Sequence, residues 1–196
     1  MGKTVVNVIG EHFYINGKKV YEDIAGSRPE AHGLLMNARF IQGIFDDKSG
    51  RERYHRYGRI FDPDQNTDML IAALPQWYKY GLRAFTVGFQ GGGPCFTIDN
   101  ATIENNPFGE DGTSLDPAYA SRMDRLIRAA DQLGMVVIVS FLYPGQVHRL
   151  QNGRAVLNAV RTASRFLKEG GYTNVIIEVC NEHNLAQPHP LLYTAE

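Results

Sequence analysis

The sequence contains only two cysteines, Cys95 and Cys180, among its 196 residues. Two thiols make neither a disulfide framework nor a cysteine-rich metal cluster, so we expect both to be buried free thiols. An excess of charge of one sign is also missing, because the formal net charge is −1 and acids and bases are scattered. A balanced charge gives no electrostatic footprint for nucleic acid or an anionic membrane surface. We therefore expect no nucleic acid and no membrane among the partners.

Long apolar runs are absent as well. No stretch approaches the ~20 apolar residues that span a bilayer, and the opening MGKTVVNVIG lacks the apolar region of a signal peptide. We expect a soluble protein, and cytoplasmic, periplasmic and secreted locations all stay open because a removed leader leaves no trace. The hydrophobic content of 43% is sufficient for a globular core.

Two kinds of pattern are present along the chain. Asn16-Gly17 between HFYI and KKVYE predicts a β-hairpin, because both residues tolerate positive φ. We expect residues 1–33 to form this hairpin and a lead-in. In residues 34–196, apolar strands alternate with amphipathic helices; the strands are expected near residues 38–45, 83–89, 135–142 and 174–180.

The expected helices have recognisable boundaries. Asp116-Pro117 and Asn152 are typical helix starts. The first helix is expected to begin at Asn66 or Thr67, with a kink or restart at Pro75. Apolar strands alternating with helices indicate an α/β fold with a parallel sheet covered by helices. A doubly wound sheet and an eight-fold barrel both satisfy this pattern.

The run VIIEVCNEHN carries the strongest chemical signal, because its apolar strand ends at Asn181 and Glu182. In α/β barrels, the carboxyl ends of the strands form the active site. Glu182 is therefore a candidate catalytic acid, although a helix-capping role explains the same position. Glu178 is expected to be a structural buried acid, and it needs a partner because an isolated buried carboxylate is costly. Arg39 and Arg83 are the candidate partners.

The stretch VIIEVCNEHN resembles the fourth-strand signature of the clan A glycoside hydrolases, which are cellulase-like retaining glycosidases. FYINGKKVYED, YGLRAFTVGFQ and LIRAADQLGMVVIVSFL resemble the family's entry segment, second strand, and second helix with third strand. The resemblance implies a (β/α)8 TIM-barrel fold, of which this chain carries an N-terminal hairpin and about four βα units. It further implies that Glu182 is the general acid/base, that Asn181 binds a sugar 2-hydroxyl, and that the substrate is an oligo- or polysaccharide, without a cofactor.

The sequence also departs from the family pattern. Thr86 stands where the family often has Arg, and Leu142 stands near its usual His, a role that His148 is the candidate to fill. The family's nucleophile is a Glu on the seventh strand, so we expect it in a C-terminal half that this chain lacks. The chain alone is then weakly active or inactive. Its open sheet edges predict a homo-oligomer or association with the missing half-barrel.

Several side chains near the predicted strand ends complete the candidate substrate site. They are Asp46, Asp47, Phe45, Phe89, Gln90, Tyr143 and His148, together with Phe96. The aromatic rings are candidates for stacking on sugars, with simple packing as the alternative. The two aspartates are expected to bind substrate or cap their loop rather than act as nucleophile.

Two segments partly match known metal- or nucleotide-binding motifs, but each lacks residues that its motif requires. The Gly91–Gly93 loop lacks the Lys-Ser/Thr of a phosphate-binding loop, and the run from Asp62 lacks the glycine and the bidentate Glu of a calcium loop. The histidines form no HExxH pair, so we expect no metal site. Two other hypotheses remain: a non-catalytic carbohydrate-binding or scaffold protein of the same fold, and an unrelated α/β enzyme.

Overall fold

The computed structural model describes residues 2–58, 60–93 and 99–182. Its first element is a three-stranded antiparallel sheet of β1 (Val6–Ile9), β2 (His12–Ile15) and β3 (Lys18–Lys19). Asn16 and Gly17 have φ of 53° and 78°, so the predicted hairpin between β2 and β3 is confirmed. The pairing of β1 with β2 was not predicted.

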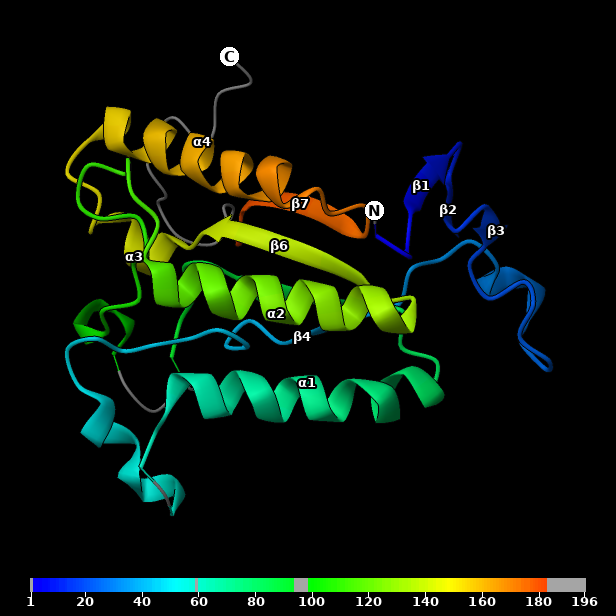
Figure 1. Cartoon of the computed structure of the whole chain (residues 1–196), viewed down its shortest axis with the longest axis horizontal. Coiled ribbons are helices and arrows are strands. Elements are labelled where there is room, and N and C mark those ends of the chain that lie inside the picture. Colours follow the sequence, from blue (N-terminus) through cyan, green and yellow to red (C-terminus); the bar gives the residue numbers. More distant parts are fainter. Residues whose placement is uncertain (1, 59, 94–98, 183–196) are drawn as a thin grey trace.

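The second sheet is parallel and carries the main fold (Figure 1). Its strands, in spatial order, are β4 (Asn37–Arg39), β5 (Ala84–Gly88), β6 (Val136–Leu142) and β7 (Val175–Cys180). All four predicted strands are present. The first is shorter than expected because the chain turns after Arg39, where the Gly43 amide bonds back to the Phe40 carbonyl at 2.7 Å.

Three long helices connect the strands: α1 (Pro63–Lys79), α2 (Pro117–Leu133) and α4 (Gly153–Gly170). The N-caps predicted at Asp116 and Asn152 are confirmed, because each side chain accepts a hydrogen bond from a backbone N–H in the first turn of its helix. The prediction for α1 was wrong. Asp62 is its N-cap, and the helix runs through Pro75, which is exposed, so that water can bond the carbonyl that the proline leaves unpaired.

The shorter helical segments lie in the loops. They are the α-helix α3 (Pro144–Val147) and the 3-10 helices η1 (Pro29–Ala31), η2 (Arg51–Tyr57) and η3 (Asn100–Thr102). None of the helices in the described ranges has the length and apolar composition needed to cross a bilayer.

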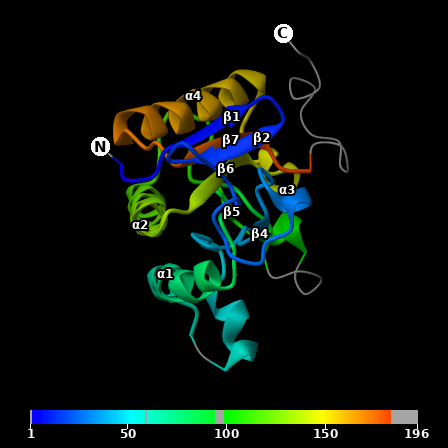
Figure 2. The same cartoon turned by 90° about the vertical axis from the view of Figure 1, so that its right-hand side faces the viewer.

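The main core lies between the parallel sheet and the three long helices. Alternate residues such as Phe85, Val87, Val137 and Val139 point from the strands into this core. Figure 2, which views the strands end-on, shows α1, α2 and α4 along one side of the sheet. A doubly wound sheet has helices on both faces and reverses its strand order. The sequential order found here is therefore not that of a doubly wound sheet.

The sheet is curved rather than flat. β4 and β7 are its two edge strands, which in a flat sheet would lie roughly 14 Å apart, three strand spacings. The Arg39 guanidinium at the end of β4 nevertheless donates a hydrogen bond to Oδ1 of Asn181, directly after β7. This contact crosses the face of the sheet opposite the helices, so that face is concave. Within the described residues the sheet remains open and forms no closed barrel.

Candidate functional site

Asn181 and Glu182 lie together at the carboxyl end of β7. The backbone N–H of Asn181 donates a hydrogen bond to the Leu142 carbonyl at the end of β6, at 2.9 Å. The side chain of Asn181 is buried. Glu182 follows with φ of 54° and an exposed side chain. Left-handed backbone costs a non-glycine residue of order 1 kcal/mol and is frequent at functional sites. The turn ends the strand alternation before Glu182, and no hydrogen bond or ion pair engages its carboxylate among the described residues.

Arg39 is the residue that sequence reasoning missed in this site. The sequence offers Arg39 as one of two candidate partners of Glu178, but the Arg39 guanidinium donates a hydrogen bond to Asn181 instead. Arg39 is the strand partner of Thr86, the position at which the sequence departs from the glycoside hydrolases that it resembles. A guanidinium is therefore present in this row of the sheet, but it comes from the neighbouring strand. The feature of the sequence that could have identified Arg39 as a site residue is its position at the end of the first strand of the parallel sheet.

Polar groups continue deeper along the concave face. Gly88, Ser140 and Glu178 are strand partners in one row across β5, β6 and β7. Ser140 Oγ and Glu178 Oε2 are buried atoms without a hydrogen-bond partner in the described part of the chain. Burial and the Glu178 carboxylate raise the pKa of the Cys180 thiol to about 11, so this free thiol stays protonated at neutral pH.

The expected pairing of Glu178 with Arg83 is also wrong. The Arg83 guanidinium lies 3.9 Å from the centre of the Tyr78 ring and donates to the Tyr78 and Leu82 carbonyls. Arg83 directly precedes β5, at the amino end of the sheet, whereas Glu178 lies in the second half of β7. The two side chains belong to different ends of the molecule.

Asp46 and Asp47 are buried and engaged in their loop. Asp46 accepts two hydrogen bonds from Arg51, at 2.8 and 2.7 Å. Asp47 is desolvated, but bonds from the Glu104 amide, the Ser49 hydroxyl and the Tyr54 hydroxyl, with the nearby Arg53 charge, lower the pKa of its carboxyl below its usual range. These contacts favour the loop-capping alternative over substrate binding for both aspartates.

Three other candidates are corrected by their burial. Phe89 is fully buried in the helix-side core beside Phe108 and Phe166, so its ring has no face available for a sugar. Phe45 is 3% exposed and packs against Tyr54. Gln90 is also fully buried, and its amide accepts from the Tyr143 backbone and donates to Asn106. Gln90 therefore braces two loops.

Tyr143 and His148 remain accessible at the carboxyl end. Tyr143 is half-buried, and its hydroxyl accepts a hydrogen bond from Asn100 at 3.1 Å. His148 is exposed and lines a pocket of about 440 Å³. Loops that follow β4, β5 and β6 supply its other lining residues, which are Lys48, Glu104, Asn106, Gly109, Glu110, Arg149 and Gln151. This pocket does not include Asn181 or Glu182. Phe96 and Cys95 lie outside the described residues.

No group of three or more His, Cys, Asp or Glu side chains is placed to hold an ion among the described residues. The aspartates after Asp62 have structural roles, since Asp64 and Asp68 each bond to Arg125 at 2.7 Å.

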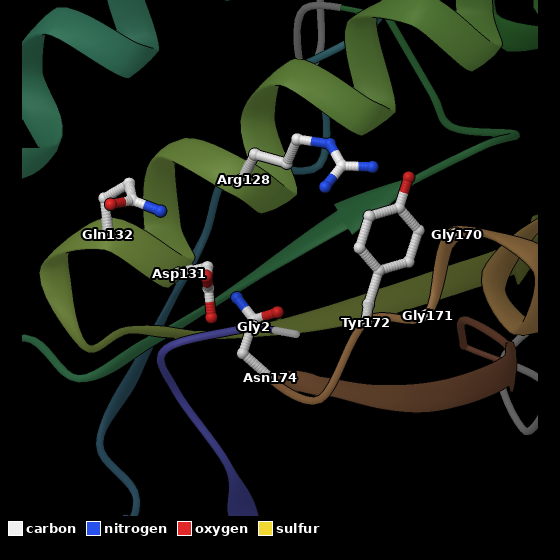
Figure 3. Close-up of a pocket in the computed structure, with 8 residues that line it drawn as sticks. All are labelled: Gly2, Arg128, Asp131, Gln132, Gly170, Gly171, Tyr172 and Asn174. Carbon is white, nitrogen blue, oxygen red and sulfur yellow. The ribbon is translucent and has the colours of Figure 1, made fainter.

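A separate pocket of about 360 Å³ lies at the amino end of the sheet (Figure 3). Asp131 in this pocket accepts the backbone amides of Lys3 and Thr4, and Asn174 donates to the Ile127 and Met135 carbonyls. These bonds tie the N-terminal segment and β7 to α2. In barrels, the amino end of the strands serves stability rather than catalysis. The side chains of Asp131 and Asn174 agree with a stabilising role, because their hydrogen bonds go to the backbone of the protein itself.

Comparison with known proteins identifies the fold. No family model and no curated protein matches the chain. Among solved structures, one described as "Glycoside hydrolase" matches with a TM-score of 0.50 and 13% identity over 92% of this chain. A putative glycoside hydrolase from Bacteroides vulgatus matches with a TM-score of 0.51 and 14% identity, also over 92% of this chain. The chain spans 34% and 32% of the length of these two structures. The chain therefore has a glycoside hydrolase-like fold.

Proposed function

We propose that this chain carries the acid/base half of a retaining glycosidase site of the clan A type. Glu182 protonates the departing glycosidic oxygen, and its carboxylate then takes a proton from the attacking water in the second step. Asn181 donates a hydrogen bond to a sugar hydroxyl. Oligo- and polysaccharides are the proposed substrates.

One observation carries the proposal. A carboxylate without a hydrogen-bond or ion-pair partner in the described residues directly follows a buried amide at the carboxyl end of a curved parallel sheet. Barrel enzymes form their active sites at that end of the sheet. The glycoside hydrolase-like fold supports the reaction class, and the left-handed backbone at Glu182 supports a functional position.

A retaining mechanism needs a second carboxylate about 5–5.5 Å from the first. Asp46 and Asp47 are engaged by Arg51, Tyr54 and Ser49, so they do not serve as nucleophile. We propose that the nucleophile comes from outside the described residues, in a second half-barrel that closes the eight-stranded arrangement. Ile177 and Val179 of β7 are 49% and 45% exposed and offer an apolar surface for such a partner.

A second candidate function is carbohydrate binding without turnover. Thr86 and Leu142 replace two polar residues of the family pattern, and this loss of sugar contacts favours it. A titration of the protein with oligosaccharides distinguishes hydrolysis from binding without turnover. A binding protein shows chemical shift changes at Asn181 on addition of oligosaccharides and releases no product.

The direct test is hydrolysis of an unactivated phenyl glycoside, whose leaving group needs a proton from the enzyme, by this chain assembled with the proposed second half-barrel and by two variants of it. Glu182→Gln removes the transferable proton, and we expect the rate to fall about 10²–10⁴-fold, the usual contribution of general acid catalysis. Glu169→Gln makes the same change near the end of α4, at the opposite end of the sheet, and should retain activity. Equal activity of Glu182→Gln and the unmutated protein would remove Glu182 from the mechanism.

A further inference from the structure

The contact between Arg39 and Asn181 fixes which end of the Asn181 amide is left for a ligand. A guanidinium carries only donors, so the amide atom that faces Arg39 is the oxygen. The Nδ2 group, with its two donors, is the part not committed to Arg39. No other hydrogen bond engages Nδ2 among the described residues. Asn181 is held as a donor, and a ligand must present an acceptor to it.

We infer that Arg39 is a positioning residue for the sugar site, which holds Asn181 as a hydrogen-bond donor toward a hydroxyl oxygen. This inference rests on the proposed function for its choice of ligand. The bond also polarises the amide, since a cation on the carbonyl oxygen strengthens the N–H donors on the other side. Arg39 thereby sets both the orientation and the strength of the donor.

The strand geometry explains why Arg39 can act at this distance. Arg39 and Asn181 are 142 positions apart in sequence and lie at opposite edges of the sheet. The side chain of Arg39 crosses the concave face next to Thr86, its strand partner. Arg39 as a whole residue is exposed, its bond to Asn181 is partly buried, and no carboxylate pairs with it within 4.0 Å in the described ranges. The single contact to Asn181 is therefore not a by-product of an ion-pair network in that part of the chain.

The first experiment does not depend on catalysis. In a nitrogen-15 spectrum, the side-chain amide of Asn181 is assigned by its loss in Asn181→Ala. Arg39→Met keeps the length of the side chain and removes its donors, so we expect the Asn181 amide resonances to shift or broaden. Arg154→Met removes an exposed arginine at the start of α4 and should leave them unchanged. Unchanged Asn181 resonances in Arg39→Met would overturn the inference.

The second experiment measures the effect on the ligand. With a nitrophenyl glycoside, Arg39→Met should lower kcat/KM about 10–100-fold, the range for residues that orient a contacting group. The loss should disappear with the deoxy substrate that lacks the bonded hydroxyl, and in the Asn181→Ala background. Arg39→Lys should recover only part of the activity, because an ammonium lacks the rigid fork of donors. A loss of equal size on the deoxy substrate would contradict the positioning role.

The two experiments separate the two ideas. Shifted Asn181 resonances in Arg39→Met without hydrolysis or sugar binding would reject the proposed function and keep the positioning of Asn181. Hydrolysis that is lost in Glu182→Gln but unaffected by Arg39→Met would keep the proposed function and reject the role of Arg39.

Discussion

At the scale of single residues, buried carboxylates in this protein fall into two groups. Asp47 receives donors from several sides, whereas Oε2 of Glu178 receives none in the described residues. An engaged buried carboxylate stabilises the fold, and an unsatisfied one costs free energy. The two residues should therefore respond to amide substitution with opposite signs.

Asp47→Asn should lower the free energy of unfolding at pH 7 by about 2 kcal/mol, because the charged acceptor of several hydrogen bonds is lost. The folded protein holds the pKa of Asp47 below its ordinary value of 3.8, so this stabilisation is present above that pH and is lost as pH falls through the folded pKa. Denaturant unfolding of both proteins between pH 7 and pH 2 measures the difference, which should narrow in acid. Asp23→Asn, at a surface pair with Lys18, should change little at any pH.

Glu178→Gln should raise the free energy of unfolding by about 1 kcal/mol, because the new amide can donate to Ser140 Oγ and removes an unsatisfied carboxylate oxygen. The same measurement on Glu182→Gln serves as control, since that side chain is exposed and unpaired in the described residues. Destabilisation by Glu178→Gln would show that its carboxylate has a structural partner.

At the scale of elements, the loop between β5 and α2 is fixed by close contact with α4. A Cβ on Gly112 would lie 2.1 Å from the Ala155 carbonyl and 2.7 Å from the Ala159 amide, with φ of +74°. Thr162 and Asn158 of α4 donate to the Gly112 and Asp111 carbonyls. This approach of two backbones leaves no room for a side chain.

Gly112→Ala should cost about 3 kcal/mol, because steric overlap adds to the strain of a left-handed alanine. Gly171→Ala is the matched control: its φ is +64° and the space around it is open, so only the backbone strain of about 1 kcal/mol applies. Thermal and denaturant unfolding compare the two. An equal decrease in the free energy of unfolding in both variants would mean that the loop between β5 and α2 can move away from α4 without losing stability.

The elements were largely predictable because their signals are local. Strands β5, β6 and β7 and the caps at Asp116 and Asn152 follow from short patterns of apolar and capping residues. The burial of Phe89 could also have been predicted from the sequence, because Phe89 points to the same side of its strand as Phe85 and Val87, which face the helices. The contact of Arg39 with Asn181 was not, because it depends on how far the sheet curves.

At the scale of the whole molecule, the curved sheet has two open edges within the described residues, and Ile177 and Val179 form an exposed apolar strip on β7. Two copies of four strands supply the eight that a closed barrel uses. Light scattering coupled to size-exclusion chromatography should therefore show a dimer. The double variant Ile177→Lys with Val179→Lys should shift it to monomer, whereas Leu157→Lys, on the exposed face of α4, should not. A monomeric unmutated protein that binds no hydrophobic dye would contradict self-association.

The most direct test of Glu182 as general acid is the dependence on leaving group. In the site assembled with the second half-barrel, dinitrophenolate leaves its glycoside without protonation, whereas the leaving group of an unactivated phenyl glycoside needs a proton from the enzyme. We expect Glu182→Gln to lose about 10²–10⁴-fold in kcat/KM on the phenyl glycoside and almost nothing on the dinitrophenyl glycoside. The same fractional loss on both substrates would contradict the assignment of proton transfer to Glu182.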